Sequence, residues 1–104
     1  MPKAESKIQL EICRYLRTQN YLFWRFDPST YVPSLGRYVK HEYVANGLPD
    51  LMILVKNKMV GLEVKKPNGS KISPHQLLMQ KRFQALGHDF HIVKSVDEVI
   101  ELGL

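Results

Sequence analysis

Apolar side chains recur at steps of three and four residues in the first part of the chain. The positions that share one side of a helical wheel are Ile8, Ile12, Tyr15 and Leu16. This period predicts a helix over residues 4–19 that ends at Asn20. The aromatic run over residues 21–26 then predicts a short strand, which the Asp-Pro pair at residues 27–28 terminates.

Strict alternation marks the centre of the chain. Two runs, over residues 50–55 and 59–65, alternate between two sets of side chains, and a loop over residues 56–58 joins them. The first set is aliphatic throughout and consists of Leu51, Ile53, Val55, Val60, Leu62 and Val64. Such alternation predicts two strands that turn one apolar face towards a core.

Two capping-box sequences predict helix starts in the second half of the chain. Residues 73–76 read Ser-Pro-His-Gln, with Pro74 in the first turn, and the helix that they open is expected to stop at Gly87. Residues 95–98 read Ser-Val-Asp-Glu and open a terminal helix. A further short strand is predicted over residues 90–94.

Together these segments predict an α/β fold, a small mixed sheet flanked by helices in the order α-β-β-β-α-β-α. Residues 28–46 contain two prolines, a glycine and several tyrosines without a clear period. They are interpreted as an irregular or hairpin-like excursion after the first strand. At 104 residues, the chain is expected to form one domain, residues 1–104.

Charge composition points to an anionic partner. Lys and Arg number 15 against 10 Asp and Glu, which gives a formal net charge of +5. No acid occurs between Val64 and His88, where the basic residues are Lys65, Lys66, Lys71, Lys81 and Arg82. Nucleic acid is the first such partner to consider, although a merely soluble basic surface explains the composition about as well.

Composition also disfavours several protein classes. The single cysteine, Cys13, cannot form an intrachain disulfide or a cysteine-based zinc site. No apolar run approaches the ~20 residues that span a bilayer, and the first residues lack the apolar segment of a signal peptide. We therefore expect a soluble, cytoplasmic protein that has no membrane partner.

Carboxylates occupy the second set of alternating positions. Asp50 and Glu63 share that strand face with Lys65 and with several apolar residues. In an antiparallel hairpin with an even-numbered loop, Asp50 would lie roughly opposite Glu63, at a side-chain separation of ~5 Å. Two carboxylates at that separation repel each other unless a cation lies between them or one holds a proton. Oxygen ligands of this kind suit Mg²⁺ or Mn²⁺ rather than zinc.

Lys65 is expected to point into the same site. A lysine beside a metal-activated water orients that water, helps to deprotonate it or stabilises charge on a phosphate. A Glu-x-Lys triplet more commonly forms an ion pair on a solvent-exposed strand, which here would join Glu63 and Lys65. Two observations weigh against this simple ion pair: Asp50 follows a turn that enters an apolar strand, and both acids share their face with hydrophobic residues.

The order and spacing of these residues resemble the signature of the PD-(D/E)xK nuclease superfamily, with Pro49-Asp50 followed after a strand-hairpin interval by Glu63-Val64-Lys65. Each of the two motifs is a weak signal alone. Further agreement extends over residues 5–9 on the first helix, residues 47–51 before the strand and residues 71–76 at the next helix. In combination, nearly the whole chain resembles the compact, standalone, phage-type members of the VRR-NUC family.

The resemblance implies a restriction-endonuclease-like fold and a metal-dependent DNA endonuclease with Mg²⁺ or Mn²⁺ as its cofactor. The metal ligands that it implies are Glu5, Asp50, Glu63 and the backbone carbonyl of Val64. The catalytic residues that it implies are Asp50, Glu63, Lys65 and Gln76. It also implies a 5′-phosphate product, a preference for branched DNA such as Holliday junctions, and a homodimer. The residues expected to hold the DNA backbone without reading sequence are Lys66, Lys71, Lys81 and Arg82.

Two of these roles have plain structural alternatives. Glu5 is also the kind of acid that a helix dipole favours in a first turn. Gln76 is also the residue that completes a capping box. A Gln76 side chain bonded to the Ser73 amide is not expected to reach the metal site as well.

Other functions stay open beside the nuclease. A catalytically silent nucleic-acid-binding module with a nuclease fold is the main alternative, although such a module has no reason to keep three mutually unfavourable charges. A basic DNA-binding protein unrelated to nucleases is less favoured, because neither long predicted helix carries an uninterrupted basic stripe. Within residues 28–46, one set of side chains forms either a DNA-facing wing or a dimer surface. This set is Tyr31, Arg37, Tyr38, Lys40 and Tyr43.

Overall fold

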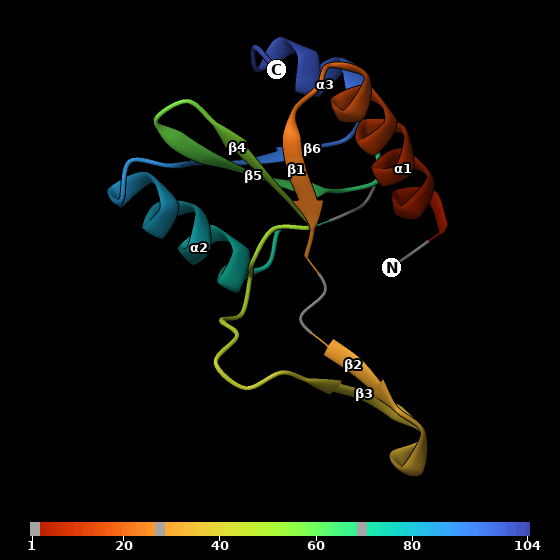
Figure 1. Ribbon diagram of the computed structural model, residues 1–104. Helices are drawn as coiled ribbons and strands as arrows, with labels where there is room; N and C mark the ends of the chain where they lie inside the picture. Colours follow the sequence, from red (N-terminus) through yellow and green to blue (C-terminus); the bar gives the residue numbers. More distant parts are fainter. Residues whose placement is uncertain (1–2, 27–28, 69–70) are drawn as a thin grey trace.

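The centre of the structure is a four-stranded mixed sheet (Figure 1). The computed structural model describes residues 3–26, 29–68 and 71–104, so the predicted strand end at residues 27–28 lies outside the described residues. The strands are β1 (Leu22–Arg25), β4 (Leu51–Val55), β5 (Lys58–Val64) and β6 (Asp89–Val93), in the spatial order β1-β4-β5-β6. β1 and β5 run antiparallel to β4, and β6 runs parallel to β5, which confirms the predicted mixed sheet.

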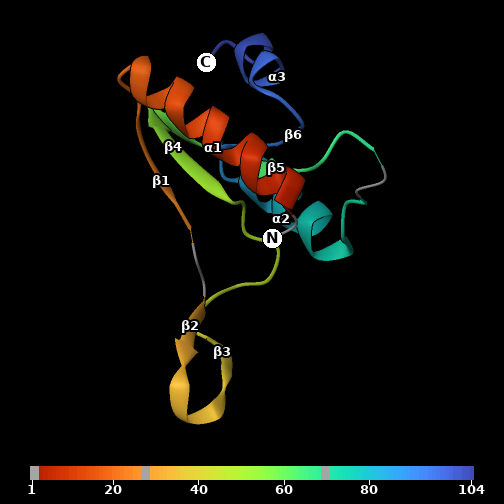
Figure 2. The same cartoon turned by 90° about the vertical axis from the view of Figure 1, so that its right-hand side faces the viewer.

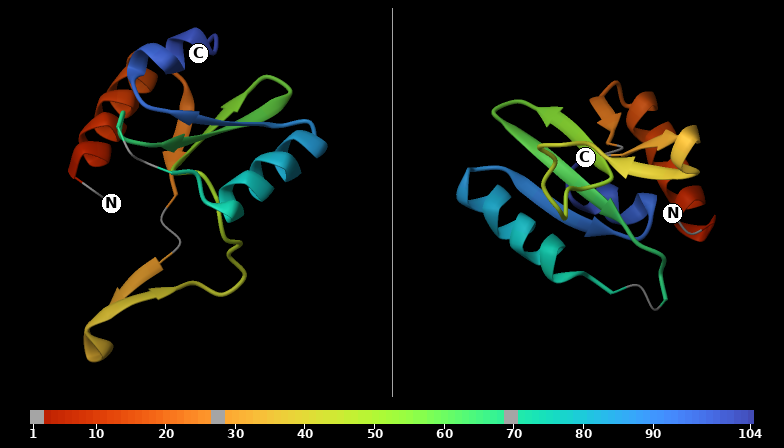
Figure 3. Two further views of the ribbon diagram at one scale, coloured as in Figure 1. Left: turned by 180° about the vertical axis from the view of Figure 1, so that it is seen from behind. Right: turned by 90° about the horizontal axis from the view of Figure 1, so that it is seen from below.

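Helices cover both faces of this sheet. α1 (Lys3–Thr18) and the short α3 (Val96–Glu101) pack together on one face, and α2 (Pro74–Ala85) packs against β6 on the other (Figure 3). The T-shaped contact between Phe83 of α2 and Phe90 of β6, with ring centroids 5.3 Å apart, belongs to the second layer. The predicted α/β class and element order are confirmed. No helix in the described part of the chain is both long and apolar enough to cross a membrane.

The apolar core lies between the sheet and the layer formed by α1 and α3. Its buried members are Ile12, Leu16, Leu51, Ile53, Val60, Leu62, Val64, Val93 and Val99. The aliphatic positions of the two alternating runs therefore do form one inward face, and the stripe of α1 packs on it. Cys13 is half-buried and packs against this core, and burial raises the pKa of its thiol.

The register of the β4–β5 hairpin decides where the opposite face points. Leu51 pairs with Leu62 and Val55 with Lys58, so the connecting turn contains two residues. Asn57 occupies that turn with φ +75°, a conformation that asparagine tolerates better than most side chains. Because the turn has an even number of residues, continuing the register by one step places Asp50 opposite Glu63, as predicted.

Capping explains where two of the helices begin. Ser73 and Gln76 form the complete capping box of α2, as the sequence predicts. At α3, the Ser95 hydroxyl accepts from the Glu98 amide at 3.2 Å, but the Glu98 carboxylate accepts from the Lys94 amide at 2.9 Å. The prediction of a second complete box is therefore wrong, because the Glu98 side chain bonds the amide one residue before the cap.

A second hairpin projects away from the sheet and the helices (Figures 1 and 2). It consists of β2 (Ser29–Val32), the 3-10 turn η1 (Pro33–Leu35) and β3 (Arg37–Lys40), and β2 and β3 pair with each other as a separate two-stranded sheet. Gly36 closes the turn with φ +64°, in the left-handed region that favours glycine. The hairpin-like interpretation of this segment is confirmed.

Candidate functional site

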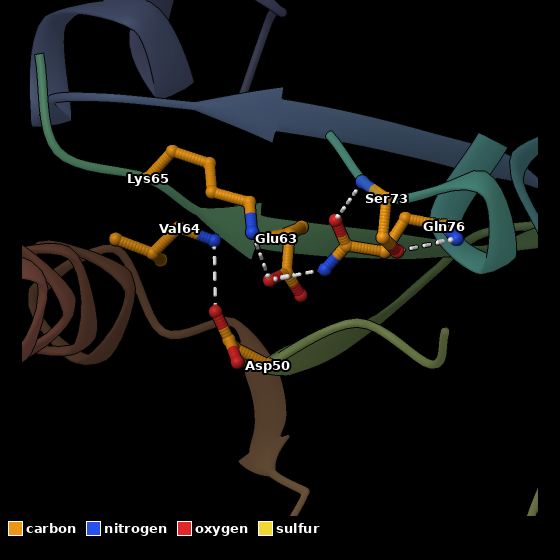
Figure 4. A network of polar contacts seen from close by, with 6 residues as sticks. All are labelled: Asp50, Glu63, Val64, Lys65, Ser73 and Gln76. Carbon is orange, nitrogen blue, oxygen red and sulfur yellow. Dashed lines mark hydrogen bonds and ion pairs between the residues drawn. The ribbon is translucent and has the colours of Figure 1, made fainter. Parts of the chain in front are cut away.

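Three segments of the chain bring polar side chains to one end of the sheet (Figure 4). Asp50 immediately precedes β4, Glu63 and Lys65 lie at the end of β5, and Gln76 lies in the first turn of α2. Asp50 and Glu63 project from the sheet face opposite the aliphatic core, because their positions alternate with Leu51 and Leu62. The central pair and the lysine predicted from the sequence are therefore brought together.

Glu63 is the most buried acid of this group, with 6% of its surface exposed. Its Oε2 accepts a hydrogen bond of 2.7 Å from the Gln76 amide nitrogen and lies 3.4 Å from the Lys65 ammonium. Both partners therefore act on the same carboxylate oxygen (Figure 4). This arrangement orients the Glu63 carboxylate and leaves Oε1 as its second, separate acceptor.

Asp50 is oriented by the backbone of the neighbouring strand. Its Oδ2 accepts a hydrogen bond of 2.9 Å from the Val64 amide. The β4–β5 backbone ladder ends at the pair Leu51 and Leu62, so the Asp50 side chain takes over the bonding of the Val64 amide beyond it. Pro49, the residue before Asp50, packs against Gly61.

The remaining carboxylate oxygens open into a cleft. Within the described residues, Asp50 Oδ1 and Glu63 Oε1 accept no hydrogen bond, and no buried side-chain oxygen or nitrogen lacks a partner. A cleft of about 520 Å³ lies against them, with Gln76 and His75 of α2 on one side and Lys40 of β3 on another.

Burial and mutual repulsion both act against ionised acids here. Burial, followed by the charge of Asp50, raises the pKa of Glu63 to about 7, although Lys65 and Gln76 oppose the shift. Burial is also the main cause that raises the pKa of Asp50, while the Val64 amide and Lys65 lower it. Two neighbouring carboxylates that resist ionisation form the kind of oxygen donor set that a divalent cation satisfies.

Gln76 departs from its predicted behaviour. Its Oε1 accepts from the Ser73 amide at 3.2 Å and completes the cap, while its Nε2 donates to Glu63. The expectation that capping excludes Gln76 from the site is therefore wrong. The physical reason is that a primary amide has an acceptor end and a donor end, which point in different directions and serve two partners at once.

Glu5, on α1, is the fourth predicted metal ligand. Among the described residues, no three His, Cys, Asp or Glu side chains gather closely enough to hold one metal ion. Glu5 is close enough for its charge to raise the pKa of Asp50, but α1 packs on the opposite face of the sheet. A contribution from Glu5, directly or through water, stays a prediction. Gln9, on the same helix, is 5% exposed and is buried rather than in the cleft.

Two glycines allow the segments of the site to approach each other. A Cβ at Gly47, whose φ is +82°, would overlap the backbone carbonyl of His75. A Cβ at Gly61 would lie 2.7 Å from Pro49 Cγ and 3.2 Å from Phe83 Cε2. The loop that leads to Asp50 therefore packs directly on the first turn of α2, and no side chain fits between them.

The four predicted DNA-contacting residues are all exposed. Lys66 and Lys71 lie in the loop between β5 and α2. Lys81 and Arg82 lie five and six residues after Gln76 on α2, about 8–9 Å further along the helix axis. The structure therefore leaves these side chains available on both sides of the cleft-forming residues, and their contact with DNA stays a prediction.

Sequence reasoning missed part of the cleft wall. Lys40, Asn46 and His75 line it together with the acids. Lys40 and Asn46 belong to a segment without periodicity, so no local pattern relates either residue to Asp50. Only the return of the chain from the β2–β3 hairpin brings them there. His75 could have been found from the sequence, because it adjoins Gln76 in the capping-box motif, and Gln76 is a residue already predicted for the site.

Comparison with known proteins agrees with this geometry. No family model matches the chain, and no curated protein matches it. A solved "VRR_NUC domain" superposes with a TM-score of 0.67 at 25% sequence identity, covering 97% of this chain and 95% of that chain. A second, a "VRR_NUC domain protein", gives a TM-score of 0.69 at 20% identity, covering 94% of this chain and 83% of that one. The predicted resemblance is confirmed at the level of the fold: over most of its length the chain has the architecture of solved VRR_NUC domains.

Proposed function

We propose that this protein is a metal-dependent endonuclease that hydrolyses phosphodiester bonds in DNA. The observation that carries the proposal is the paired Asp50 and Glu63, each held at one oxygen by a hydrogen bond and both lining the same cleft. Lys65, 3.4 Å from Glu63, adds a cation at the same place. In a domain with the VRR-NUC architecture, these residues fit a hydrolytic site better than a structural ion pair.

The residues present fit an oxygen-preferring divalent cation. Asp50 Oδ1, Glu63 Oε1 and the Val64 carbonyl would hold Mg²⁺ or Mn²⁺, with Glu5 as a further contributor directly or through water. Such an ion, when bound, supplies Lewis-acid chemistry that activates water and neutralises charge on a phosphate. Its positive charge would also favour the ionised form of both acids, whose pKa values are raised mainly by burial.

Lys65 and Gln76 have separate tasks in this proposal. The Lys65 ammonium would stabilise the negative charge that develops on the phosphate oxygens during attack. Gln76 is a positioning residue: it holds Glu63 Oε2 at 2.7 Å and so keeps Oε1 directed into the cleft. The exposed residues Lys66, Lys71, Lys81 and Arg82 would bind the DNA backbone.

We further propose branched DNA as the substrate and a homodimer as the working form. Cutting a four-way junction symmetrically takes two sites, and a two-fold dimer supplies them. Exposed apolar side chains on the edge strand β1 and its neighbour β4 support the dimer. Their exposed fractions are 63% for Leu22, 41% for Trp24 and 46% for Leu54. Light scattering tests the assembly, since a 12.1 kDa mass with junction cleavage intact would contradict it.

Incubation with linear, flap and four-way-junction DNAs tests the proposed function directly. Each DNA is treated in Mg²⁺, in Mn²⁺ and in chelator, with wild-type protein and with Asp50→Asn. Cleavage that requires the ion and the Asp50 carboxylate supports the nuclease. Binding without cleavage under every condition would instead support the silent DNA-binding module.

A further inference from the structure

One face of the β2–β3 hairpin carries an aromatic pair and a lysine. Tyr31 pairs with Tyr38 across the strands, and Ser29 pairs with Lys40. These two pairs share a face because their members are two residues apart along each strand. The tyrosine rings lie 5.2 Å apart and are tilted by 58°, yet they stay 50% and 66% exposed.

The lysine end of this face reaches the candidate active site. Lys40 lines the same cleft as Asp50 and Glu63. Tyr38 lies two residues further out, about 7 Å along the strand. The face therefore continues from the cleft into the projecting hairpin without an intervening element.

The charge of Lys40 has no acidic partner among the described residues. The ion pairs found there are Lys58–Asp89 and Lys65–Glu63, and Lys40 instead donates to the neutral amide oxygen of Asn46. Arg37 adds a second cation to the hairpin, and residues 29–40 contain no acid. The arm is thus positively charged along its length and suits an anionic chain rather than a second copy of itself, which would bring like charges together.

We propose that the β2–β3 hairpin is a DNA-binding arm whose Tyr31–Tyr38 pair stacks on an unpaired base beside the phosphate held in the cleft. Lys40 contacts the phosphate between that base and the cut. Tyrosine rings stack on any base that is outside the duplex, whereas a paired base inside the duplex does not offer its face. The inference rests on the proposed function and narrows its substrate to DNA with an unpaired nucleotide next to the cleavage point.

The test compares two DNAs of the same sequence in chelator. One is fully paired, and the other carries a single unpaired 2-aminopurine at a branch or flap. Wild-type protein should quench the 2-aminopurine fluorescence and bind the unpaired DNA more tightly. Tyr31→Ala/Tyr38→Ala should lose about 10-fold in affinity for the unpaired DNA, with a change below about two-fold for the paired DNA, and should lose the quench.

Two controls separate stacking from other effects. Tyr31→Phe/Tyr38→Phe keeps both rings and should bind like the wild type. Ile100→Ala removes an apolar side chain of α3 that is 46% exposed and belongs to neither the hairpin nor the cleft lining, so it should change neither affinity. If the double alanine variant does not fold, Tyr38→Ala alone is measured, with at least a three-fold selective loss expected.

Each of the other outcomes would contradict the proposal that the β2–β3 hairpin is a DNA-binding arm. An equal loss on both DNAs, or no loss, removes the stacking role. A change in oligomeric mass in Tyr31→Ala/Tyr38→Ala assigns the face to a second copy of the chain. Because binding is measured in chelator, where cleavage does not occur, the two proposals can fail separately. Quenching of 2-aminopurine fluorescence with no DNA cleavage in Mg²⁺ or Mn²⁺ refutes the nuclease alone. DNA cleavage together with normal DNA binding by the tyrosine variants refutes the arm alone.

Discussion

The chain contains two antiparallel hairpins that share a backbone pattern and differ in burial. In β4–β5, Leu51, Ile53 and Leu62 are fully buried. In β2–β3, every residue of the two strands is at least partly exposed. A hairpin alone is marginally stable in water, so the first gains its rigidity from the core and the second has little packing. Side chains on the buried hairpin are therefore held in fixed positions, whereas those on the exposed hairpin are free to adjust to a ligand.

The largest expected effect is the loss of DNA cleavage when a charged residue at the β4–β5 hairpin is neutralised. Asp50→Asn removes one charge from the buried hairpin, and DNA cleavage in Mg²⁺ or Mn²⁺ should fall by several orders of magnitude. DNA binding should persist or tighten slightly, because a negative charge that faces phosphate is lost. Plasmid nicking and anisotropy measure the two quantities.

Asp89→Asn is the matched control for that change. Asp89 lies on the same sheet but pairs with Lys58 at 2.6 Å, and both side chains are substantially exposed. Its neutralisation should leave cleavage near the wild-type rate. Near-native cleavage by Asp50→Asn would remove the active site from these residues.

Substitutions in the β4–β5 hairpin should also lower the free energy of unfolding more than substitutions in the β2–β3 hairpin. Leu62→Ala opens a cavity in the core and should lower the free energy of unfolding by about 2–5 kcal/mol. Val39→Ala truncates a half-buried side chain of β3 and should lower it by less than about 1 kcal/mol. Urea unfolding measures both, and similar losses at the two positions would show that the projecting hairpin packs in solution.

The electrostatic strain of the buried hairpin should appear as pH dependence. Because the pKa of Glu63 is raised from 4.5 to about 7, its contribution to stability is fully present below pH 4.5 and is lost as the pH rises through 7. Without metal, Glu63→Gln should therefore be more stable than the wild type at pH 8 by about 1–3 kcal/mol relative to the same comparison at pH 4.5. Urea titrations in chelator at the two pH values measure this difference, and identical pH profiles would contradict the raised pKa.

The smallest effect concerns the loop beside the site. Lys66→Ala should weaken binding to all DNA sequences alike and reduce the log–log salt slope by about one unit. Lys56→Ala removes an equally exposed lysine from the turn at the other end of the β4–β5 hairpin, and its slope should not change. Equal slopes for the two variants would place DNA elsewhere.

Periodicity predicted the parts of the molecule that local geometry controls. Alternation over two runs was enough to define the apolar face, and the even-numbered turn then placed Asp50 opposite Glu63. The Ser73 cap was equally local. These features follow from backbone geometry and from which face is apolar, so they survive without knowledge of the tertiary structure.

The features that escaped prediction depend on contacts between distant segments. Lys40 enters the cleft because the chain returns from a hairpin that has no period of its own. How closely Glu5 approaches Asp50 depends on the packing of α1 against the sheet, which its position in the helix does not reveal. Gln76 reaches Glu63 because Gly47 admits α2 so closely to the loop before β4. None of these distances is encoded in neighbouring residues.

The shared amide of Gln76 makes the first turn of α2 a reporter of what occupies the cleft. The Ser73 N–H is protected by Gln76 Oε1, and the Gln76 N–H by the Ser73 hydroxyl. An ion bound at Glu63 Oε1 would withdraw negative charge from the carboxylate, weaken its hydrogen bond from Gln76 Nε2 and so alter how often this turn opens. Amide hydrogen exchange at Ser73 and Gln76 should therefore change with ion concentration, and it would register occupancy without any nucleic acid or turnover.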